Sequence, residues 1–229
     1  MPDFDFLRKR MNGLGGPEIP VSFERQRQTM VEEQLQGRGI RDSRVLLAMS
    51  QVPRHEFLPT SLRHAAYEDR ALPLGEGETL SQPFIVALIL QSLELSPGAH
   101  VLDVGSGTGY QSAVLASMGC TVWAVEINEA LAESSRSRLK RLGYPEVTVL
   151  AGDGALGWPV HAPFDATVVA AAAEEIPPAL LRQMREGGRL VAPVGAGEDQ
   201  MLTRVVRRGE SFARESLAPV RFVPLKRAG

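Results

Sequence analysis

The stretch GEGETLSQPF, residues 75–84, places two small hydroxyls, Thr79 and Ser81, between a glycine-rich turn and a proline that opens an apolar run. A serine hydroxyl can donate a hydrogen bond to a carboxylate oxygen without the strong ion pairing of an arginine or a lysine. A hydroxyl before a proline is also a common helix start, because it can cap the first turn. From these residues alone, both a helix cap and a group that orients an anionic ligand stay open.

A second candidate site is the stretch VLDVGSGTGYQ, residues 101–111, in which Gly105, Gly107 and Gly109 stand between a predicted strand and a predicted helix. Glycines at such a turn let a ligand approach bare backbone. The spacing is G-x-G-x-G, whereas a loop that binds a dinucleotide pyrophosphate usually has G-x-G-x-x-G. Asp103 directly precedes the loop, where a carboxylate disfavours a phosphate and can accept from a cationic amino group.

Two further acidic residues follow the next two predicted strands. Glu126 ends TVWAVE, where a carboxylate can bind both hydroxyls of a ribose. Asp153, followed by Gly154, can accept from the exocyclic amine of an adenine. Each acid alone could equally be a solvated or helix-capping residue, but three at successive strand ends favour a positively charged adenosine ligand without phosphate. S-adenosylmethionine is such a ligand.

The elements that must position these residues alternate between strands and helices. This alternation predicts an α/β, Rossmann-like fold with a mostly parallel sheet and helices on both faces. The tail QMLTRVVRRGESFARESLAPVRFVPL contains two β-like runs around a turn and predicts an antiparallel C-terminal end of the sheet. The predicted strands are HVLDV, TVWAVE, VTVLAG, FDATVVAA and GRLVAPVG, and the predicted helices follow Pro83, the glycine loop, Asn128 and Pro177.

The N-terminal part differs from this core. Residues 1–20 mix charge, glycine and proline and predict a flexible extension without a signal peptide. Residues 21–51 have two helical patterns, the second with Asp42 as N-cap, and about thirty Pro- and Gly-rich residues follow. We expect a single domain over residues 21–229, with a helical and substrate-loop part (21–82) and a cofactor-binding core (83–229).

Composition narrows the partners. The net charge of -2 and the pI near 6.1 give no basic field for nucleic acid, and no apolar run is long enough to cross a membrane. The single cysteine, Cys120, and the absence of a metal-ligand cluster favour a reduced, cytoplasmic protein without a metal. His55 and His64 have no partners at recognisable spacing and are expected to be packing or surface residues.

Several longer stretches resemble the protein-L-isoaspartate O-methyltransferase family, from about Met30 to Leu225. Those stretches are MVEEQL, GIRD, VPRHEFLP, AYEDRALPLGEGETLSQP, GDGALGWP, FDATVVAAAAEEIP and PVRFVPL. Two positions depart from the family's usual pattern: Glu78 stands where glutamine is common, and Glu174 where proline is common.

The resemblance implies a repair enzyme that methylates the free α-carboxylate of L-isoaspartyl residues in damaged proteins and peptides, and we expect the enzyme to be a monomer. The ester then closes to a succinimide, which hydrolyses partly to normal aspartyl. Ser81 matches the active-site serine, flanked by Thr79 and Gln82, and Arg221 is a weaker candidate for substrate binding. The residues expected at S-adenosylmethionine are Asp103, Gly105, Gly107, Gly109, Glu126, Asp153 and Gly154.

Four other functions compete with this one. An O-methyltransferase of the same fold could act on another carboxylate or a small molecule. A nitrogen acceptor is disfavoured, because the usual Asn/Asp-Pro-Pro-aromatic motif is replaced by AAAAEEIP. A non-catalytic cofactor binder would not need the hydroxyl motif, and a dehydrogenase is disfavoured by the loop spacing and the acids.

Overall fold

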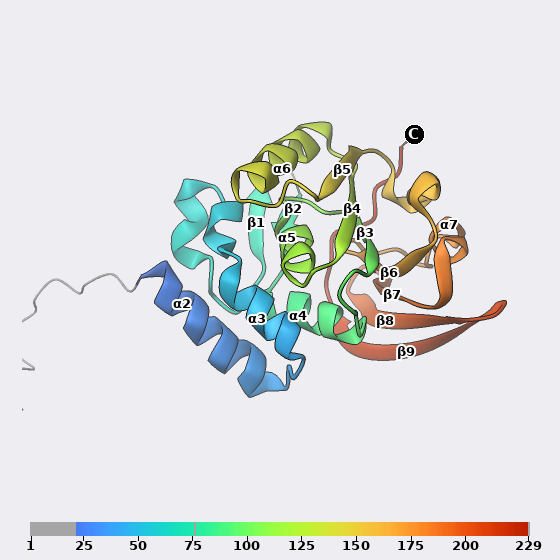
Figure 1. The fold of residues 1–229 in the computed structure, drawn as a ribbon, viewed down its shortest axis with the longest axis horizontal. Coiled ribbons are helices and arrows are strands. Elements are labelled where there is room, and N and C mark those ends of the chain that lie inside the picture. Colours follow the sequence, from blue (N-terminus) through green and yellow to red (C-terminus); the bar gives the residue numbers. More distant parts are fainter. Residues whose placement is uncertain (1–21, 76, 229) are drawn as a thin grey trace, which may run out of the picture.

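The computed structural model describes residues 22–75 and 77–228, so the predicted extension 1–20 lies outside the described residues. From β3 onward, strands and helices build a seven-stranded sheet in the order β5-β4-β3-β6-β7-β8-β9 (Figure 1). The strands of this sheet are β3 (His100–Val104), β4 (Thr121–Glu126), β5 (Thr148–Ala151), β6 (Phe164–Val169), β7 (Met184–Ala196), β8 (Asp199–Arg208) and β9 (Ser211–Val220).

The pairing confirms the predicted fold class. β3 lies between β4 and β6 and is parallel to both, and the pairs β4–β5 and β6–β7 are parallel as well. The last two pairings, β7–β8 and β8–β9, are antiparallel, as the tail predicts. The chain leaves β3 toward one side of the sheet and later returns to its other side, so the carboxyl end of β3 is a topological switch point, where open α/β sheets bind ligands.

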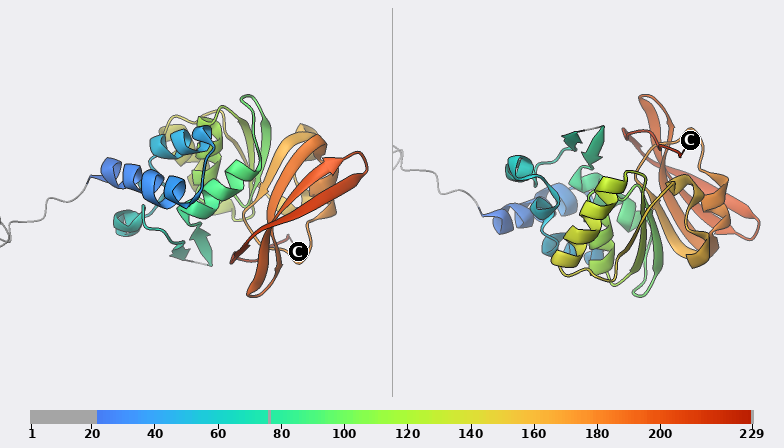
Figure 2. Two further views of the ribbon diagram at one scale, coloured as in Figure 1. Left: turned by 90° about the horizontal axis from the view of Figure 1, so that it is seen from below. Right: turned by 90° about the horizontal axis from the view of Figure 1, so that it is seen from above.

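Helices cover the two faces of the sheet unequally. The residues of the larger core come from one face of the sheet and from helices α3 to α6, and the smaller core packs on the other face against α7. Figure 2 shows the helices coloured from blue to yellow-green gathered on one side of the sheet. The helices are α2 (Phe23–Thr29), α3 (Ser43–Gln51), α4 (Pro83–Ser92), α5 (Tyr110–Ser117), α6 (Glu129–Arg141) and α7 (Pro178–Arg182).

The two predicted N-terminal helices are confirmed. α2 continues as a π-helical turn over Met30–Leu35 and a 3-10 turn over Gln36–Arg38, and Gly39 ends it in the left-handed conformation with φ 100°. α3 begins at the predicted N-cap, where the Asp42 carboxylate accepts from the Arg44 backbone amide at 2.9 Å.

The segment between α3 and α4 contains more regular structure than its composition indicates. It holds two 3-10 helices, Arg54–Phe57 and Thr60–Ala65, and an antiparallel hairpin of β1 (Leu72–Gly75) and β2 (Glu78–Leu80). α4 then starts at Pro83 with Gln82 as N-cap and without a side-chain capping bond. The capping interpretation of Ser81 is therefore wrong, because Ser81 lies one residue too early.

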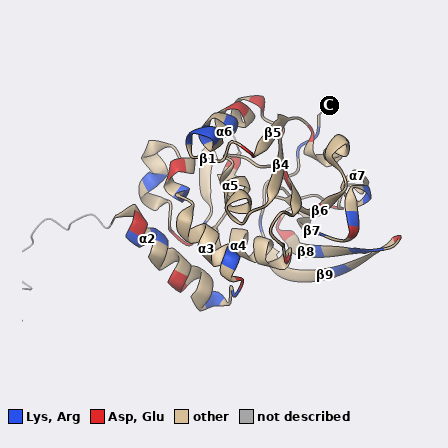
Figure 3. Cartoon of the chain, viewed as in Figure 1, with Lys and Arg blue, Asp and Glu red and all other residues tan. Residues whose placement is uncertain are grey.

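Charged residues are mixed on the surface. In the view of Figure 3, α2 carries both acidic and basic residues, α6 carries acidic residues in its first half and basic residues in its second, and the strands of the sheet interior carry few charges. Within residues 22–75 and 77–228, no helix is long and apolar enough to span a membrane.

Candidate active site

The glycine loop folds over the carboxyl ends of β3 and β4. Gly105, Gly107 and Gly109 have backbone φ values of 73°, 55° and 89°. Residues that carry a Cβ rarely adopt this left-handed conformation. The backbone amides of Gly105 and Ser106 donate to the Val125 carbonyl at 2.8 and 3.2 Å. The three predicted glycines are thus required by the turn that leads from β3 into α5.

Asp103 lies beneath this loop and is fully buried. Its carboxylate accepts from Gln111 Nε2 at 2.7 Å and from the Ser112 hydroxyl at 2.6 Å, both on α5. Burial raises the pKa of Asp103 to about 6, although the two hydrogen bonds oppose the shift. Gln111, rather than Asp103, borders the cavity at the loop, so Asp103 can act on a ligand there through Gln111 or through its charge.

Glu126 is held by the backbone on both oxygens. Oε2 accepts from the Gly107 amide at 2.8 Å and Oε1 from the Asn128 amide at 2.9 Å, and the side chain is buried. A carboxylate has about four acceptor positions, so two remain for the hydroxyls of a ribose. The end of β4 therefore carries a preoriented acceptor next to the glycine loop.

Asp153 and Gly154 follow β5 in the same region. Asp153 caps a 3-10 helix, Gly154–Leu156, because its Oδ1 accepts from the Ala155 amide at 2.8 Å. Its Oδ2 accepts from the Ala228 amide at 3.2 Å, near the C-terminus. Gly154 packs against β3 so closely that an added Cβ would lie 2.5 Å from Val104 Cγ1.

Two small cavities lie between these strand ends and the β1–β2 hairpin. One is lined by Gly105, Glu126, Gly154, apolar side chains and, at its rim, Glu78 and Lys226, and the other by the glycine loop, the hairpin and the start of α5. Ser106, Thr108 and Tyr110 line the second, and the hydroxyls of Ser106 and Thr108 are buried without a hydrogen-bond partner among the described residues. An apolar slot beside a ribose acceptor and a group of unpartnered hydroxyls fit an adenosyl amino acid.

The C-terminal segment forms the outer wall of the apolar slot, which sequence reasoning did not anticipate. Residues Val223–Lys226 line it. They are fixed beside the end of β6, since the Ala172 amide donates to the Val223 carbonyl at 2.8 Å and the Leu225 amide to the Ala172 carbonyl at 2.7 Å. The motif PVRFVPL indicated family resemblance but contains no chemically distinctive residue that could have revealed this role.

The hydroxyl motif lies where the cofactor cavities meet a larger one. Thr79, Ser81 and Gln82 line a cavity of about 730 Å³ between the hairpin and residues 219–223, and Thr79 and Ser81 also border the cavity at the glycine loop. Gln82 is held by bonds from Nε2 to the carbonyl and the carboxylate of Asp69, at 3.0 and 2.8 Å. No hydrogen bond of the Ser81 hydroxyl to another described residue is found, so its donor can serve a ligand.

Arg221 and His55 have other partners in this structure, and His64 is exposed. Arg221 lines the larger cavity but pairs with Glu198 across its rim. His55 stacks on Phe23 with ring centroids 4.1 Å apart, and its Nδ1 lies 2.8 Å from the Tyr67 hydroxyl. His55 is therefore a packing residue, as expected, and burial lowers its pKa.

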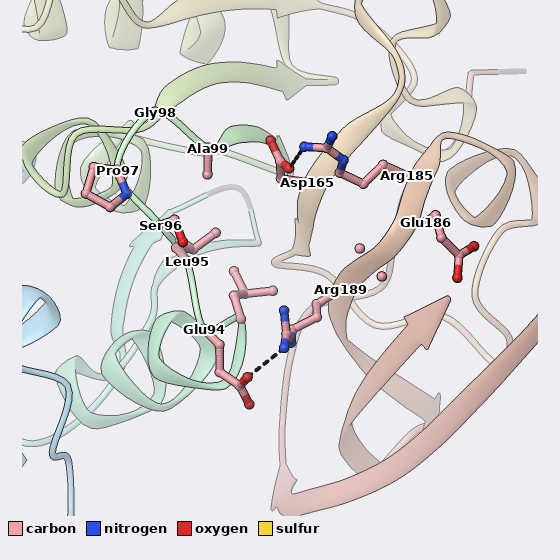
Figure 4. A pocket seen from close by; sticks show the side chains of 13 residues that line it. Glu94, Leu95, Ser96, Pro97, Gly98, Ala99, Asp165, Arg185, Glu186 and Arg189 are labelled. Atoms are coloured by element: carbon pink, nitrogen blue, oxygen red, sulfur yellow. Dashed lines mark hydrogen bonds and ion pairs between the residues drawn. The ribbon is translucent and has the colours of Figure 1, made fainter. Parts of the chain in front are cut away.

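A further cavity, of about 440 Å³, lies at the other end of the sheet, beside the amino ends of β3, β6 and β7 (Figure 4). Four of its charged side chains form ion pairs, Arg185 with Asp165 and Arg189 with Glu94 at 2.6 Å, while the Glu186 carboxylate accepts from the Gly209 amide. Asp165 also accepts from the His100 backbone amide at 2.8 Å. None of the predicted site residues line this cavity, and its balanced ion pairs hold the loop before β3 against β7.

The parallel sheet, the G-x-G-x-G loop at its switch point and the acidic residues near the carboxyl ends of β3, β4 and β5 define an S-adenosylmethionine-dependent methyltransferase. The profile of the protein-L-isoaspartate(D-aspartate) O-methyltransferase family matches residues 25–228. The chain belongs to this family, which confirms the resemblance seen in its motifs.

Individual relatives agree with this assignment. The chain is 53% identical over 204 residues to protein-L-isoaspartate O-methyltransferase 2 of Pelobacter propionicus, covering 88% of this chain and 91% of the relative. It is 47% identical over 207 residues to the Herpetosiphon aurantiacus protein-L-isoaspartate O-methyltransferase, covering 90% and 92%.

Solved structures give the same result. One protein-L-isoaspartate O-methyltransferase superimposes with a TM-score of 0.79 at 30% identity, over 89% of this chain and 66% of that longer chain. A Plasmodium falciparum protein assigned to the same enzyme, solved with S-adenosyl-L-homocysteine, has a TM-score of 0.77 at 27% identity and covers 88% and 99%.

Proposed function

We propose that this chain methylates the free α-carboxylate of L-isoaspartyl residues in damaged proteins and peptides, with Ser81 orienting that carboxylate. The activity and the use of S-adenosylmethionine follow from the family to which the chain belongs. The observation that carries the role of Ser81 is its position on both the large cavity and the cavity at the glycine loop. At Ser81, a carboxylate bound in the large cavity can therefore meet a methyl donor bound in the cavity at the glycine loop.

The acceptor needs orientation more than deprotonation. An α-carboxylate has a reference pKa of about 3.5 and is ionised at neutral pH, so no general base is required. When bound, S-adenosylmethionine supplies a methyl group on a positively charged sulfur, which is already a good leaving group. Ser81 can donate to one carboxylate oxygen and leave the other directed toward the donor, and such alignment can contribute on the order of 7–11 kcal/mol.

The cofactor-binding roles are proposed residue by residue. Glu126 would hold the ribose hydroxyls, Asp153 and Gly154 would face the adenine, and the glycine loop would lie along the amino acid portion. Asp103 would favour the cationic amino group through its charge and through Gln111. The preorganised Glu126 carboxylate and the unpartnered hydroxyls at the loop support this arrangement.

Methyl transfer to matched peptides tests the proposal. We expect methylation of a peptide with one L-isoaspartyl residue and none of its normal aspartyl twin, with a base-labile ester as product. Ser81→Ala should lower kcat by roughly ten- to a few hundred-fold, about 1.4–3.5 kcal/mol, and leave the affinity for S-adenosylhomocysteine unchanged. Equal methylation of both peptides would contradict the substrate, and full activity of Ser81→Ala would remove Ser81 from the mechanism.

We also propose that residues 21–229 act as one monomeric domain in the cytoplasm, on proteins rather than nucleic acid. Two cores that share one sheet support the single domain. The single, buried cysteine supports a cytoplasmic location. The slightly negative net charge supports a protein rather than a nucleic acid as the substrate. Sedimentation of the purified chain at micromolar concentration would reveal any dimer.

A further inference from the structure

A buried cation lies directly behind the hydroxyl motif. Arg54 begins the 3-10 helix Arg54–Phe57 and is fully buried. Its surrounding sequence, VPRHEFLP, suggests an ordinary polar loop. Its Nη2 donates to the Ser81 carbonyl at 2.8 Å and its Nε to the Ala66 carbonyl at 2.7 Å. The guanidinium carbon lies 4.9 Å from the centre of the Tyr110 ring, at the start of α5.

This charge has no acidic counterpart among the described residues. No described carboxylate forms an ion pair with Arg54, whose side-chain neighbours are the Ala66 and Ser81 carbonyls and the Tyr110 hydroxyl. Its neighbour Tyr110 stays neutral, since burial raises the pKa of that phenol to about 12. Burying an unpaired cation costs several kcal/mol. A neutral hydrogen-bond donor could bind the same two carbonyls at a lower free-energy cost of burial. The cost of burying a charge here therefore points to a functional role for it.

We propose that Arg54 is a positioning residue for methyl transfer: it fixes the backbone of Ser81 and supplies a positive potential that favours an anionic carboxylate at that hydroxyl. The guanidinium joins Ala66, which follows the 3-10 helix Thr60–Ala65, to Ser81, which follows the hairpin, and so fixes where Ser81 lies. The bond to Ser81 involves its backbone carbonyl, so the Ser81 hydroxyl stays available to the substrate. A charge held in a site of low dielectric acts more strongly than one in water.

This inference rests on the proposed role of Ser81, and its test separates the two. Arg54→Met keeps most of the side-chain volume but removes the fork and the charge. We expect kcat for an isoaspartyl peptide to fall ten- to a hundred-fold, while the Kd for S-adenosylhomocysteine changes less than threefold. Arg54→Lys keeps the charge but not the forked geometry, and we expect it to restore part of the lost kcat.

Phe57→Leu is the matched control for lost packing. Phe57 is buried in the same 3-10 helix and contacts Tyr110 edge-on, with ring centroids 5.5 Å apart. It donates nothing to Ser81, so this variant should lower the Tm and leave kcat within twofold. The inference fails if Phe57→Leu loses as much kcat as Arg54→Met at a similar Tm, or if Arg54→Met shows unchanged kcat. Should Arg54→Met not fold, Arg54→Lys is compared with Phe57→Leu in the same way, and an unchanged kcat overturns the inference.

A double-mutant cycle distinguishes the two proposals. If Arg54 acts through Ser81, adding Arg54→Met to Ser81→Ala should lower kcat by less than threefold, far less than it does alone. If Ser81→Ala is impaired and the kcat loss of the double variant equals the product of the two single losses, only the role of Arg54 is refuted. Full activity of Ser81→Ala would instead refute the proposed role of Ser81.

Discussion

The Lys226 ammonium nitrogen lies 2.8 Å from Glu78 Oε1, and this pair joins the C-terminal segment to the β1–β2 hairpin across the apolar slot of the cofactor site. The slot and the adjoining cavity hold only about 40 and 50 Å³. Ligand pockets commonly hold roughly 300–1,000 Å³. The hairpin and the C-terminal segment must therefore separate to admit an adenosyl compound, and the ion pair opposes that separation.

Breaking this pair should speed cofactor exchange. Glu78→Gln removes the charge and keeps the shape, and a partly exposed ion pair of this kind contributes about 0.4–1 kcal/mol. We expect S-adenosylhomocysteine to dissociate about two to five times faster, as measured by stopped flow, with the difference shrinking at high salt. Glu133→Gln, which breaks a pair with Arg136 on α6, is the control. An unchanged rate in Glu78→Gln would show that the pair does not limit opening.

The buried Asp103 predicts a pH dependence of stability. Its pKa is raised from 3.8 to about 6, so the folded protein binds this proton more tightly than the unfolded chain does. The stabilisation is present in full below pH 3.8 and is lost as the pH rises through 6. The free energy of unfolding, measured with denaturant relative to Asp103→Asn, should fall by on the order of 2–3 kcal/mol from pH 4 to pH 7. If the difference in the free energy of unfolding between the wild type and Asp103→Asn stayed constant over this pH range, the raised pKa of Asp103 would be contradicted.

The same carboxyl should link cofactor affinity to pH. If ionised Asp103 favours a cationic amino group, S-adenosylhomocysteine should bind more tightly as the pH rises from 5 to 7. Isothermal titration should show that rise in the wild type and a flat profile in Asp103→Asn. Parallel profiles in both proteins would assign the pH dependence to another group.

Gly154 should be required for packing. An added Cβ would lie 2.5 Å from Val104 Cγ1, so Gly154→Ala should cost about 1–3 kcal/mol of stability and weaken cofactor binding. At Gly152 the nearest atom to an added Cβ is 3.7 Å away, and Gly152→Ala is therefore the matched control. The second-site change Val104→Ala should recover part of the cofactor affinity of Gly154→Ala. Without such recovery, the close approach to Val104 would not explain the loss.

Cys120 should be inert in the folded protein. The thiol is buried, and burial raises its pKa to about 11. We expect alkylation by iodoacetamide at pH 8 to be roughly a hundredfold slower than in denaturant, because the thiolate is scarce and shielded. Mass spectrometry of timed samples measures both rates. Equal rates would show that the segment around Cys120 opens readily.

Much of this protein is determined by local sequence. The strands from β3 to β9 and the helices α3, α4, α5 and α6 lie where periodicity, Asp42, Pro83 and Asn128 place them, because caps and alternating burial act over a few residues. The glycine loop and the acids near the carboxyl ends of β3, β4 and β5 were likewise recognisable, since their spacing along the chain fixes their places at strand ends.

Only the tertiary structure decided which of these groups face a ligand. Asp103 lies next to Ala124, two residues before the level of Glu126, and bonds to α5, whereas backbone amides orient Glu126 toward the slot. Arg54 contacts Ser81 across 27 positions, and Lys226 contacts Glu78 across 148. Such contacts depend on how distant segments pack, and no local pattern encodes the burial of a charge. The sequence thus determines the elements and their chemistry, while packing decides what each side chain meets.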